Sequence, residues 1–573
     1  PDSDAVVYPS LDEDVKAARS LIFQSLPSPG GAPKPPETIF AGESVLPHIA
    51  HVIDRNTVLA EATLQIAETP GFPNFTALVT RGEESSWAAS QDRVLPAGAD
   101  GRVVTADQSE IVYQTAIDHE NRALVSVDPL TGRRRDLVPA KADEVLHVVD
   151  RVGDLYCAFY LSDTPDCAAT DKTWRLRLFD KTGGELRTVE MAELGLPPRL
   201  DVPLSFSGGR DSTKTEFTLG EVGVPAKTFS LDVARIEEMV AQKQDVAKAP
   251  IESLLTERAS EAVDFDPSKV GRHFEQVVDK NGNVNTIEYR WAKVRPEGRY
   301  DSFEDLPKDA VVKGYAYGSI GIVRTPNNEP GYRDLIERGV VIPYITIPGG
   351  GARGTESRDA GALDRDQTID ALEAVGERLR QHFPEGFIGL EGRSWGGWLV
   401  ENVMARAAES AEKLFDYYVS IVSAGESDSL IASFFQRWGL HDFGALMGRR
   451  GQVDPDQRDY AIEQATRTST PRLFQKLSKA VKSFFSVRQK EAAGDVIFAV
   501  EKNDDRAPPG SIAKSAFHLT NWLGFGERVN VITGDGGHGS RSHADEMALV
   551  LNRVLVANGR QLGESHPLRR EVN

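Results

Sequence analysis

Two patterns of apolar and polar residues divide the chain. From about residue 311 onward, short apolar runs alternate with longer amphipathic stretches. We predict strands at residues 311–317, 340–347, 387–390, 417–422, 496–500 and 529–532, with helices between them, such as one over 364–382. Buried parallel strands read as continuous apolar runs, and their crossover connections are usually helices. This order therefore predicts a doubly wound, mostly parallel α/β sheet.

The first half of the chain contains short strand-like runs, and a turn motif repeats among them. Asp128, Asp180 and Asp232 each follow an apolar run and are spaced by 52 residues. A period of roughly 40–50 residues built of short strands is typical of the blades of a β-propeller. Hairpins of an irregular β domain are the alternative. Residues 41–240 hold about four units of this period.

With 573 residues, the chain is long enough to form two hydrophobic cores. We predict an amphipathic helix over residues 11–26, followed by a tether rich in Pro and Gly. The predicted parts are an N-terminal segment 1–40, a β-propeller-like domain 41–250 and an α/β domain 251–573. Within the last domain, the charged and mostly helical stretch 427–492 is expected as an insertion that covers the functional edge of the sheet.

One segment that joins a predicted strand to a predicted helix carries recognisable chemistry. It reads Gly392-Arg393-Ser394-Trp395-Gly396-Gly397, and its G-x-S-x-G spacing is that of a nucleophile elbow. The turn is so tight that the serine backbone is strained and only glycine fits two residues to either side. The serine hydroxyl then stands at the N-terminus of a helix, where a developing negative charge is favoured. Ser394 is therefore a candidate nucleophile.

A serine nucleophile of this kind needs an acid and a base, which follow it in the chain. Of the five histidines after Ser394, His538 lies on a glycine-rich loop after a predicted strand. From such a loop an imidazole can reach across the top of a sheet. Asp504 and Asp505 follow another predicted strand, and an aspartate there can accept the imidazole N–H and fix its tautomer. Spacing alone does not choose between the two aspartates.

Together, these motifs give the chain a resemblance to a known family. From about Phe274 to its end, the chain resembles the prolyl oligopeptidase family of serine peptidases. The matching segments, in the family's order, are 315–320, 349–351, 392–397, 504–506 and 537–539. The resemblance implies an α/β-hydrolase catalytic domain with an N-terminal β-propeller, usually of more blades than the four units counted here. It also implies short or flexible peptides as substrates, because a propeller over the site excludes folded proteins.

The resemblance assigns roles to particular residues. It implies a triad of Ser394, Asp504 and His538, and so prefers the first of the two adjacent aspartates as the acid. It implies an oxyanion hole made of the Tyr317 hydroxyl and the backbone N–H of Trp395. The expected reaction is attack by the serine on an acyl carbon, with formation and hydrolysis of an acyl-enzyme.

On the substrate side, the chain both follows and departs from the family's pattern. Arg506 matches the arginine that binds a substrate carbonyl. Ile320 replaces the aromatic residue of the S1 pocket, so specificity for proline does not follow. Trp438 resembles the tryptophan that stacks on a proline ring, with a core or rim tryptophan as the alternative. Gln436 and Arg437 stand where oligopeptidases selective for basic residues carry acidic ones, which disfavours cleavage after Arg or Lys.

Charge and composition narrow the range of partners. The formal net charge of −20 argues against a nucleic-acid partner, because phosphates would be repelled. No apolar run reaches the roughly 20 residues that span a bilayer, so membrane insertion is not expected. No Cys/His spacing resembles a zinc site, and no Gly-rich phosphate loop is present, so neither a metal nor a cofactor is expected. The sequence does not indicate the oligomeric state.

The two cysteines, Cys157 and Cys167, bear on the compartment. We expect two free thiols in a cytoplasmic enzyme, with a disulfide in an oxidising compartment as the alternative. Because the chain begins with Pro1 instead of methionine, a periplasmic or secreted protein stays open.

The sequence thus predicts a serine peptidase that hydrolyses short or flexible peptides. An esterase, or a hydrolase specialised for isopeptides or cyclic peptides, is the alternative on the same triad, since the elbow does not distinguish amides from esters. A peptide-binding protein without activity is a third possibility. The complete triad argues against it.

Overall fold

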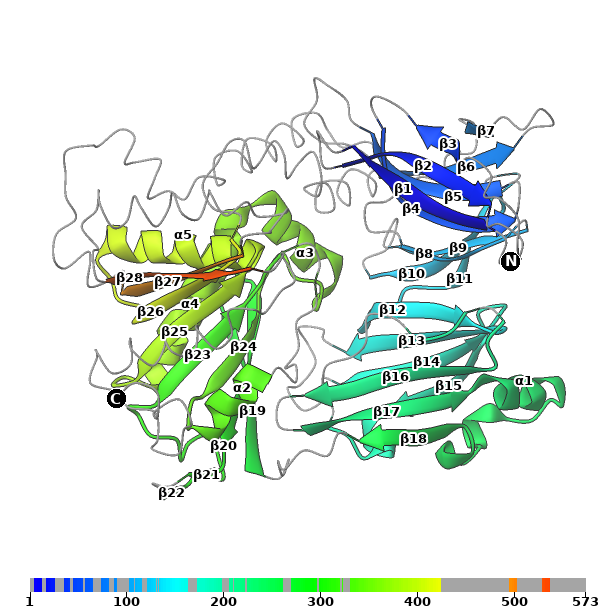
Figure 1. Cartoon of the computed structure of the whole chain (residues 1–573). Helices are drawn as coiled ribbons and strands as arrows, with labels where there is room; N and C mark the ends of the chain where they lie inside the picture. Colours follow the sequence, from blue (N-terminus) through cyan, green and yellow to red (C-terminus); the bar gives the residue numbers. More distant parts are fainter. Residues whose placement is uncertain are drawn as a thin grey trace.

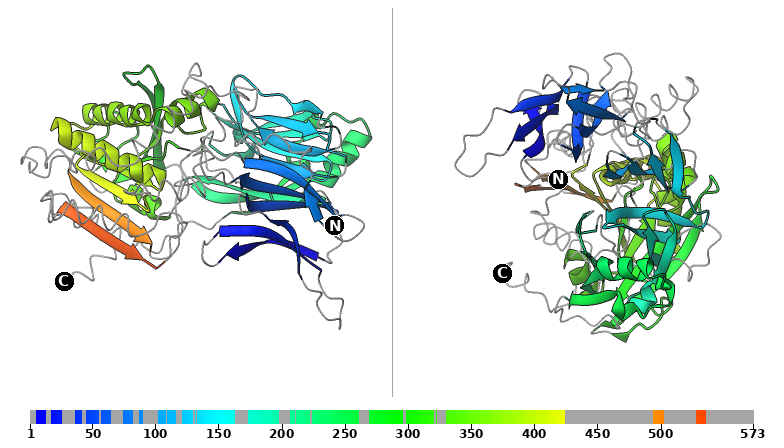
Figure 2. Two further views of the ribbon diagram at one scale, coloured as in Figure 1. Left: turned by 90° about the horizontal axis from the view of Figure 1, so that it is seen from above. Right: turned by 90° about the vertical axis from the view of Figure 1, so that its right-hand side faces the viewer.

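The computed structural model of the chain describes about three fifths of its residues, and structural statements below concern these alone. They are residues 5–12, 17–25, 36–41, 45–54, 57–64, 74–81, 87–89, 102–107, 109–115, 121–129, 131, 133–162, 173–197, 206–209, 211–221, 224–260, 269–295, 298–319, 322, 330–423, 494–501 and 528–535. We refer to those up to residue 260 as the β-sheet region and to those from residue 269 onward as the α/β region. Figure 1 shows the two regions side by side, and Figure 2 shows them from two further directions.

The β-sheet region consists of antiparallel meanders. Its described residues form five sheets, each built from strands that are consecutive in the chain. The first holds β1 (Ala5–Asp12), β2 (Ala17–Ser25) and β3 (Glu37–Ala41), and the second β4 (Val45–Asp54), β5 (Thr57–Leu64), β6 (Asn74–Arg81) and β7 (Trp87–Ala89). The third holds β8 (Arg102–Ala106), β9 (Ile111–Thr115), β10 (Ala123–Val127) and β11 (Arg134–Val138). The fourth holds β12 (Glu144–Val152), β13 (Leu155–Ser162), β14 (Trp174–Asp180) and β15 (Glu185–Glu190), and the fifth β16 (Lys214–Glu221), β17 (Val224–Asp232) and β18 (Leu255–Ser260).

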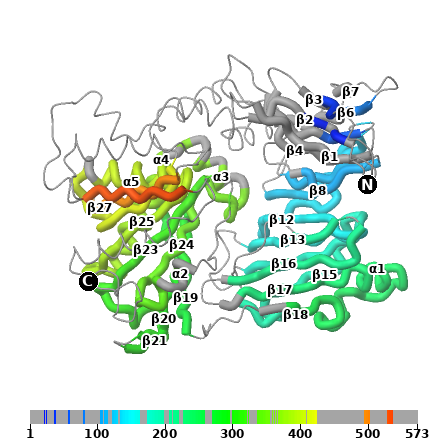
Figure 3. The backbone as a smooth tube through the Cα atoms, viewed as in Figure 1, coloured from blue at the N-terminus to red at the C-terminus, as the bar shows by residue number. Residues whose placement is uncertain are grey.

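Successive small meanders of this kind are the units of a propeller-like fold. Among the described residues, four such sheets lie between β4 and β18. The tube in Figure 3 follows the chain from one sheet to the next.

The repeated aspartates mark the same kind of position in successive sheets. Asp128 follows the third strand of one sheet, and Asp180 ends the third strand of the next. Each carboxylate accepts a backbone N–H from the turn that follows, Asp128 from Thr131 and Asp180 from Thr182. Asp232 instead ends β17 and caps the N-terminus of helix α1 (Val233–Ala241). The period of 52 residues therefore reflects the spacing of strand ends, which need a side-chain acceptor for the turn that follows.

The helix predicted over residues 11–26 is wrong. Residues 5–12 and 17–25 form strands β1 and β2, which pair with each other in antiparallel fashion, and β2 also pairs with β3. The periodicity of a short apolar run does not distinguish a helix from a strand. Here the segment is a strand because it pairs with neighbouring strands. The β-sheet region therefore begins within the segment that the sequence analysis assigned to a helix and a tether.

Short helical segments connect strands within the β-sheet region. Besides α1, they are the 3₁₀ turns η3 (Met191–Leu194), η4 (Val246–Lys248) and η5 (Ile251–Ser253). Helix α1 and η4 both lie between β17 and β18.

The α/β region is built on one sheet of eight strands, and the six strands predicted from the sequence are all present in it. Its order is β19-β20-β24-β23-β25-β26-β27-β28. The strands are β19 (Val270–Val278), β20 (Val284–Ala292), β23 (Val311–Ala316), β24 (Ile342–Thr346), β25 (Phe387–Arg393), β26 (Tyr417–Ile421), β27 (Asp495–Glu501) and β28 (Val529–Gly534). The hairpin β19–β20 is antiparallel and joins β24 in antiparallel fashion, whereas the pairs from β24 through β28 are parallel. The short pair β21 (Val294–Arg295) and β22 (Gly298–Arg299) lies outside this sheet.

Helices cover both faces of this sheet, as a doubly wound fold requires. They are α2 (Pro330–Glu337), α3 (Gly354–Leu363), α4 (Arg365–His382) and α5 (Trp395–Ser410). Apolar side chains of α4 and α5 form one core with Ile388 and Leu390 of β25, while α2 forms another with Phe387 of the same strand. The alternation of sides explains why this strand reads as a continuous apolar run.

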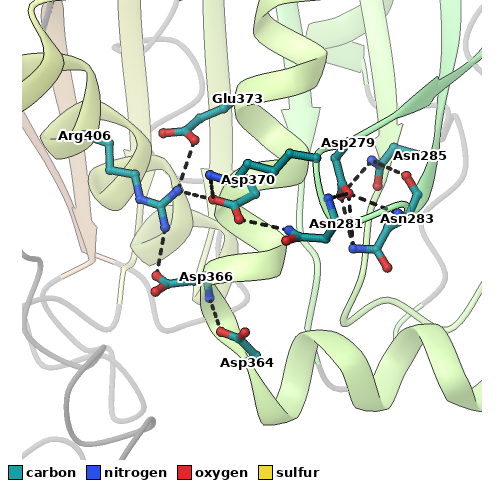
Figure 4. A network of polar contacts seen from close by, with 10 residues as sticks. Asp279, Asn281, Asn283, Asn285, Asp364, Asp366, Asp370, Glu373 and Arg406 are labelled. Atoms are coloured by element: carbon teal, nitrogen blue, oxygen red, sulfur yellow. Dashed lines mark hydrogen bonds and ion pairs between the residues drawn. The ribbon is translucent and has the colours of Figure 1, made fainter.

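A polar network fastens helix α5 to helix α4 (Figure 4). Arg406 of α5 donates to Asp366, Asp370 and Glu373, all on α4. Asp370 also accepts the side-chain N–H of Asn281, from the turn between β19 and β20, at 2.9 Å. Three segments far apart in the sequence are thereby joined around one guanidinium, which holds α5 near its C-terminal end.

Two further expectations concern membranes and cysteines. None of the helices in the described part of the chain is both long and apolar enough to cross a membrane. Cys157 is a free, buried thiol on β13, and burial raises its pKa to about 12. Cys167 lies outside the described residues.

Candidate active site

Ser394 occupies a strained turn between a strand and a helix. β25 ends at Arg393, α5 begins at Trp395, and Ser394 between them has φ 55° and ψ −120°. Positive φ is costly for a residue with a side chain and persists only where the surroundings enforce it. The strand, turn and helix expected for a nucleophile elbow are therefore present at this serine.

The glycines of the motif are required by close backbone approaches. A Cβ at Gly392 would lie 2.1 Å from the carbonyl oxygen of Gly396. A Cβ at Gly396 would lie 2.6 Å from the carbonyl oxygen of Ala316, at the end of the neighbouring strand β23. Both distances are far below van der Waals contact, so a larger residue at either position displaces the backbone. The G-x-S-x-G spacing is thus explained by two packing contacts.

Backbone hydrogen bonds fix the serine on both sides. The N–H of Ser394 donates to the carbonyl oxygen of Ile421, at the end of β26, at 2.8 Å. The carbonyl oxygen of Ser394 accepts the N–H of Trp398 at 3.2 Å, which closes the first turn of α5. The serine thereby stands at the N-terminal end of a helix of 16 residues, where the helix dipole favours negative charge.

Tyr317 lies beside this turn. It follows β23, which pairs in parallel with β25 so that Ala316 is opposite Gly392. Its side chain is buried, and a Cβ at Gly396 would come within 3.2 Å of the Tyr317 Cα. The predicted oxyanion donors, the Tyr317 hydroxyl and the Trp395 N–H, therefore come from adjacent segments at the same end of the sheet.

The triple glycine also reaches this end of the sheet. Gly349 has φ 89°, and a Cβ there would lie 2.2 Å from the carbonyl oxygen of Gly318. The motif segments 315–320 and 349–351 are therefore in backbone contact. The glycine at 349 is explained by this approach and by its positive φ.

The structure brings together Ser394, Trp395 and Tyr317, and the remaining predicted site residues lie outside the described part. These are Asp504 with its alternative Asp505, His538, Arg506, Ile320 and Trp438. Strands β27 and β28, which precede the candidate acid and base in the chain, are described. They follow β26 in parallel order, so their carboxyl ends share the edge of the sheet at which Ser394 stands. The roles of these residues stay predictions.

Sequence reasoning missed a buried carboxyl group on helix α5. Glu401 is only 2% exposed, and its Oε1 accepts the Ser420 hydroxyl from β26 at 2.6 Å. Burial raises its pKa from the ordinary 4.5 to about 7. The available signal was a single acidic residue among the apolar neighbours Val400 and Val403.

A second buried carboxylate near the elbow is fully compensated. Glu391 of β25 forms an ion pair with Lys313 of β23, and it accepts the Tyr332 hydroxyl of α2 at 2.6 Å. The Lys313 ammonium also lies 4.6 Å from the centre of the Tyr332 ring. This group joins two central strands and one helix on the face opposite α5, and it leaves no charge uncompensated. Among the described residues, no group of three or more His, Cys, Asp or Glu side chains could hold a metal ion.

Comparison with solved structures identifies the fold. A structure from an analysis of two prolyl endopeptidases superposes with a TM-score of 0.66 at 18% identity, over 97% of this chain and 72% of that one. Prolyl oligopeptidase B from Galerina marginata, bound to a 35mer hydrolysis and macrocyclization substrate, gives 0.70 at 15% identity, over 98% and 72%. Oligopeptidase B from Leishmania major gives 0.69 at 14% identity, over 97% and 71%.

These comparisons define the class of fold and no more. No protein-family model and no curated protein matches the sequence. The likeness is therefore one of structure, and it extends over nearly the whole chain. The chain has the prolyl oligopeptidase fold, an α/β-hydrolase part with a propeller-like β region, which confirms the predicted fold class.

Proposed function

We propose that this protein is a serine peptidase of the prolyl oligopeptidase type that hydrolyses short or flexible peptides. One observation carries the proposal: Ser394 stands in a strained elbow, with Tyr317 beside it, in a fold shared with structures of prolyl endopeptidases and oligopeptidases. Strain at a serine costs stability and is typical of residues whose side chain must be presented for reaction.

In the proposed reaction, the Ser394 hydroxyl attacks the acyl carbon of a peptide bond. His538 takes the hydroxyl proton and later gives it to the leaving amine, and Asp504 holds the imidazole in the required tautomer. The Trp395 N–H and the Tyr317 hydroxyl donate to the oxyanion. The acyl-enzyme is then hydrolysed by water, with His538 again as the base.

On the substrate side, Arg506 is proposed to bind a carbonyl of the peptide, with Ile320 and Trp438 near the scissile residue. The structure of Galerina marginata prolyl oligopeptidase B contains a peptide substrate. This supports a peptide in the present protein through the shared fold. An esterase, or a hydrolase of isopeptides or cyclic peptides, is the alternative on the same groups.

Wild-type protein and Ser394→Ala should be compared on a mixed library of short peptides, with the products read by mass spectrometry, and on a small ester. We expect serine-dependent cleavage of linear peptides, and the cut sites define the specificity. Ser410→Ala is the matched control, because Ser410 is an exposed serine in the last turn of the same helix. Rapid serine-dependent turnover of the ester without peptide cleavage would overturn the peptidase proposal in favour of the alternative.

A further inference from the structure

The buried carboxyl group of Glu401 lies beneath the elbow and takes no part in the proposed reaction. Glu401 is in the second turn of the helix that Ser394 precedes. The hydroxyls of Ser420 and Ser423 both hydrogen-bond its carboxyl group. One helix thus presents the candidate nucleophile at its N-terminus and, two turns later, binds the end of strand β26.

The segment that Glu401 binds is the one that holds Ser394. Between Ser420 and Ser423 lies Ile421, whose carbonyl oxygen accepts the Ser394 N–H at 2.8 Å. The next residue, Val422, has φ 41°, a left-handed conformation that is strained for a β-branched side chain. The N–H of Val422 donates to the carbonyl oxygen of Ala499 on β27 at 2.8 Å. A strained segment of this kind keeps its shape only if its neighbours enforce it.

Helix and strand end also approach closely at this point. A Cβ at Gly397 would lie 3.0 Å from the Ser420 Oγ and 3.0 Å from the Ser423 Cβ. The two serines that bind Glu401 therefore pack directly against the first turn of α5. A displacement of either serine is transmitted to the elbow by contact.

Charged groups on the surrounding elements are engaged elsewhere. On β25, Glu391 faces the opposite side of the sheet and pairs with Lys313, while Arg393 adjoins the elbow. On α4, Glu373 and Asp370 bind Arg406, which follows Glu401 by five residues on α5.

Strand β26 contributes tyrosines and an aspartate to the same surroundings. The buried Tyr417 and Tyr418 keep their protons, because burial raises both pKa values far above neutral pH. Asp416, just before the strand, pairs with Arg380. In the described part of the chain, the raised pKa of Glu401 arises from burial, opposed by the two serine hydroxyls, and no charged group contributes.

We propose that Glu401 is a positioning residue for Ser394: its carboxyl group binds the hydroxyls of Ser420 and Ser423 to helix α5 and thereby fixes the carbonyl that holds the Ser394 N–H. Loss of its proton leaves a buried carboxylate that can only accept hydrogen bonds and that has no cation beside it among the described residues. This charge draws the surrounding dipoles toward itself and opposes the negative charge that develops at the oxyanion. Activity therefore falls as Glu401 ionises. The inference rests on the proposed role of Ser394.

The test compares the pH profiles of kcat/KM for wild type and Glu401→Gln between pH 5.5 and 9.5. A small chromogenic ester is the substrate, and the rate of Ser394→Ala is subtracted at each pH. Glutamine has nearly the same shape and cannot ionise. For wild type we expect a bell, with a decline above about pH 7 that approaches tenfold per pH unit. For Glu401→Gln we expect the decline to be absent and the rate to stay level above pH 7.

A matched control and a second variant complete the test. Glu373→Gln removes another partly buried carboxyl on α4, whose pKa is also raised by burial, and should leave the wild-type bell unchanged. Ser420→Ala removes a hydrogen bond that lowers the pKa of Glu401, so the alkaline decline should move to higher pH. If Glu401→Gln fails to fold, this variant still tests whether ionisation of Glu401 causes the alkaline decline.

The outcomes separate the two proposals. If wild type and Glu401→Gln show the same alkaline decline, or if Ser420→Ala leaves it in place, the role of Glu401 is overturned while the serine hydrolase stands. If wild type shows no Ser394-dependent turnover at any pH with esters or peptides, the proposed function is overturned, and the role of Glu401 with it. An infrared band of a protonated carboxyl group, present at pH 6 and lost in Glu401→Gln, is also expected; its absence contradicts the neutral state.

Discussion

The β-sheet region and the α/β region each contain a titratable side chain whose pKa is shifted in the direction that favours its neutral form. In the β-sheet region this group is His147 on β12, whose ring packs edge-on against Trp174. Burial, together with the charge of Arg122, lowers its pKa to about 3. In the α/β region the group is Glu401, with a pKa raised to about 7. His147 stays neutral throughout the physiological range, whereas Glu401 titrates in the middle of it.

The two regions also differ in which residues their folds bring together. Each sheet of the β-sheet region pairs strands that are neighbours in the chain. In the α/β region, crossover connections place Tyr317, Ser394 and Ile421 at one end of one sheet. A meander places strands that are consecutive in the chain side by side. In a doubly wound sheet, by contrast, side chains from motifs far apart in the sequence lie together at the carboxyl ends of the strands. This difference explains why the candidate chemistry lies entirely in the α/β region.

The largest expected effect comes from removing one hydroxyl of the α/β region, with a buried hydroxyl of the β-sheet region as the control. Tyr317→Phe removes a proposed oxyanion donor and should lower kcat by about 10²–10³, with a smaller change in KM. The matched substitution in the β-sheet region is Tyr156→Phe, since Tyr156 is buried on β13. This substitution should leave kcat unchanged. Steady-state kinetics on the same peptide measure both variants. An unchanged kcat in Tyr317→Phe removes the tyrosine from the oxyanion hole.

The second test uses the opposite signs of the two pKa shifts. The favourable contribution of neutral Glu401 is complete below the unfolded pKa near 4.5 and is lost as the pH rises through about 7, which amounts to roughly 3 kcal/mol. His147 behaves in the reverse sense: the unfolded chain takes up a proton below about pH 6.5, so stability is lost as the pH falls toward 3.

Denaturant unfolding between pH 4 and 9 checks both signs. Glu401→Gln should flatten the alkaline decline in stability, and His147→Phe should flatten the acid decline while keeping a ring against Trp174. If each variant flattens the side assigned to the other, the contrast between the regions is wrong.

The third test places the same steric defect in both regions. Gly396→Ala forces a Cβ to within 2.6 Å of the Ala316 carbonyl oxygen, and Gly183→Ala forces one to within 1.9 Å of the Leu137 carbonyl oxygen in the β-sheet region. Each should destabilise the protein by about 1–3 kcal/mol. Only Gly396→Ala should also lower kcat, by about 10²-fold, because it displaces the elbow. Thermal unfolding and kinetics well below Tm separate the two effects. A comparable loss of kcat in Gly183→Ala would show that the defect acts through stability alone.

Much of the α/β region could be predicted from the sequence because its signals are local. Buried parallel strands read as continuous apolar runs, so all six predicted strands are found within a few residues of their expected bounds. The elbow was predictable for the same reason, because the tight turn requires glycine at positions 392 and 396 and these glycines are visible in the sequence. The acid, the base and the substrate residues stay predictions, because they lie outside the described residues.

Other features depended on partners that are distant in the sequence. Residues 17–25 form a strand instead of the predicted helix because β1 and β3 lie on either side of it, and periodicity does not reveal such pairing. The antiparallel hairpin β19–β20 at the sheet edge was not predicted either.

Glu401 shows most clearly where the information in the sequence ends. Its place on a helix after the elbow can be read from the sequence, but its protonation depends on burial and on two serines from the next strand. The sequence by itself determined the elements and the candidate nucleophile, because backbone geometry and apolar periodicity are local properties. Only the tertiary structure decided which polar groups lose their water and which partners they meet, because desolvation and hydrogen bonding are set by residues that the fold brings together.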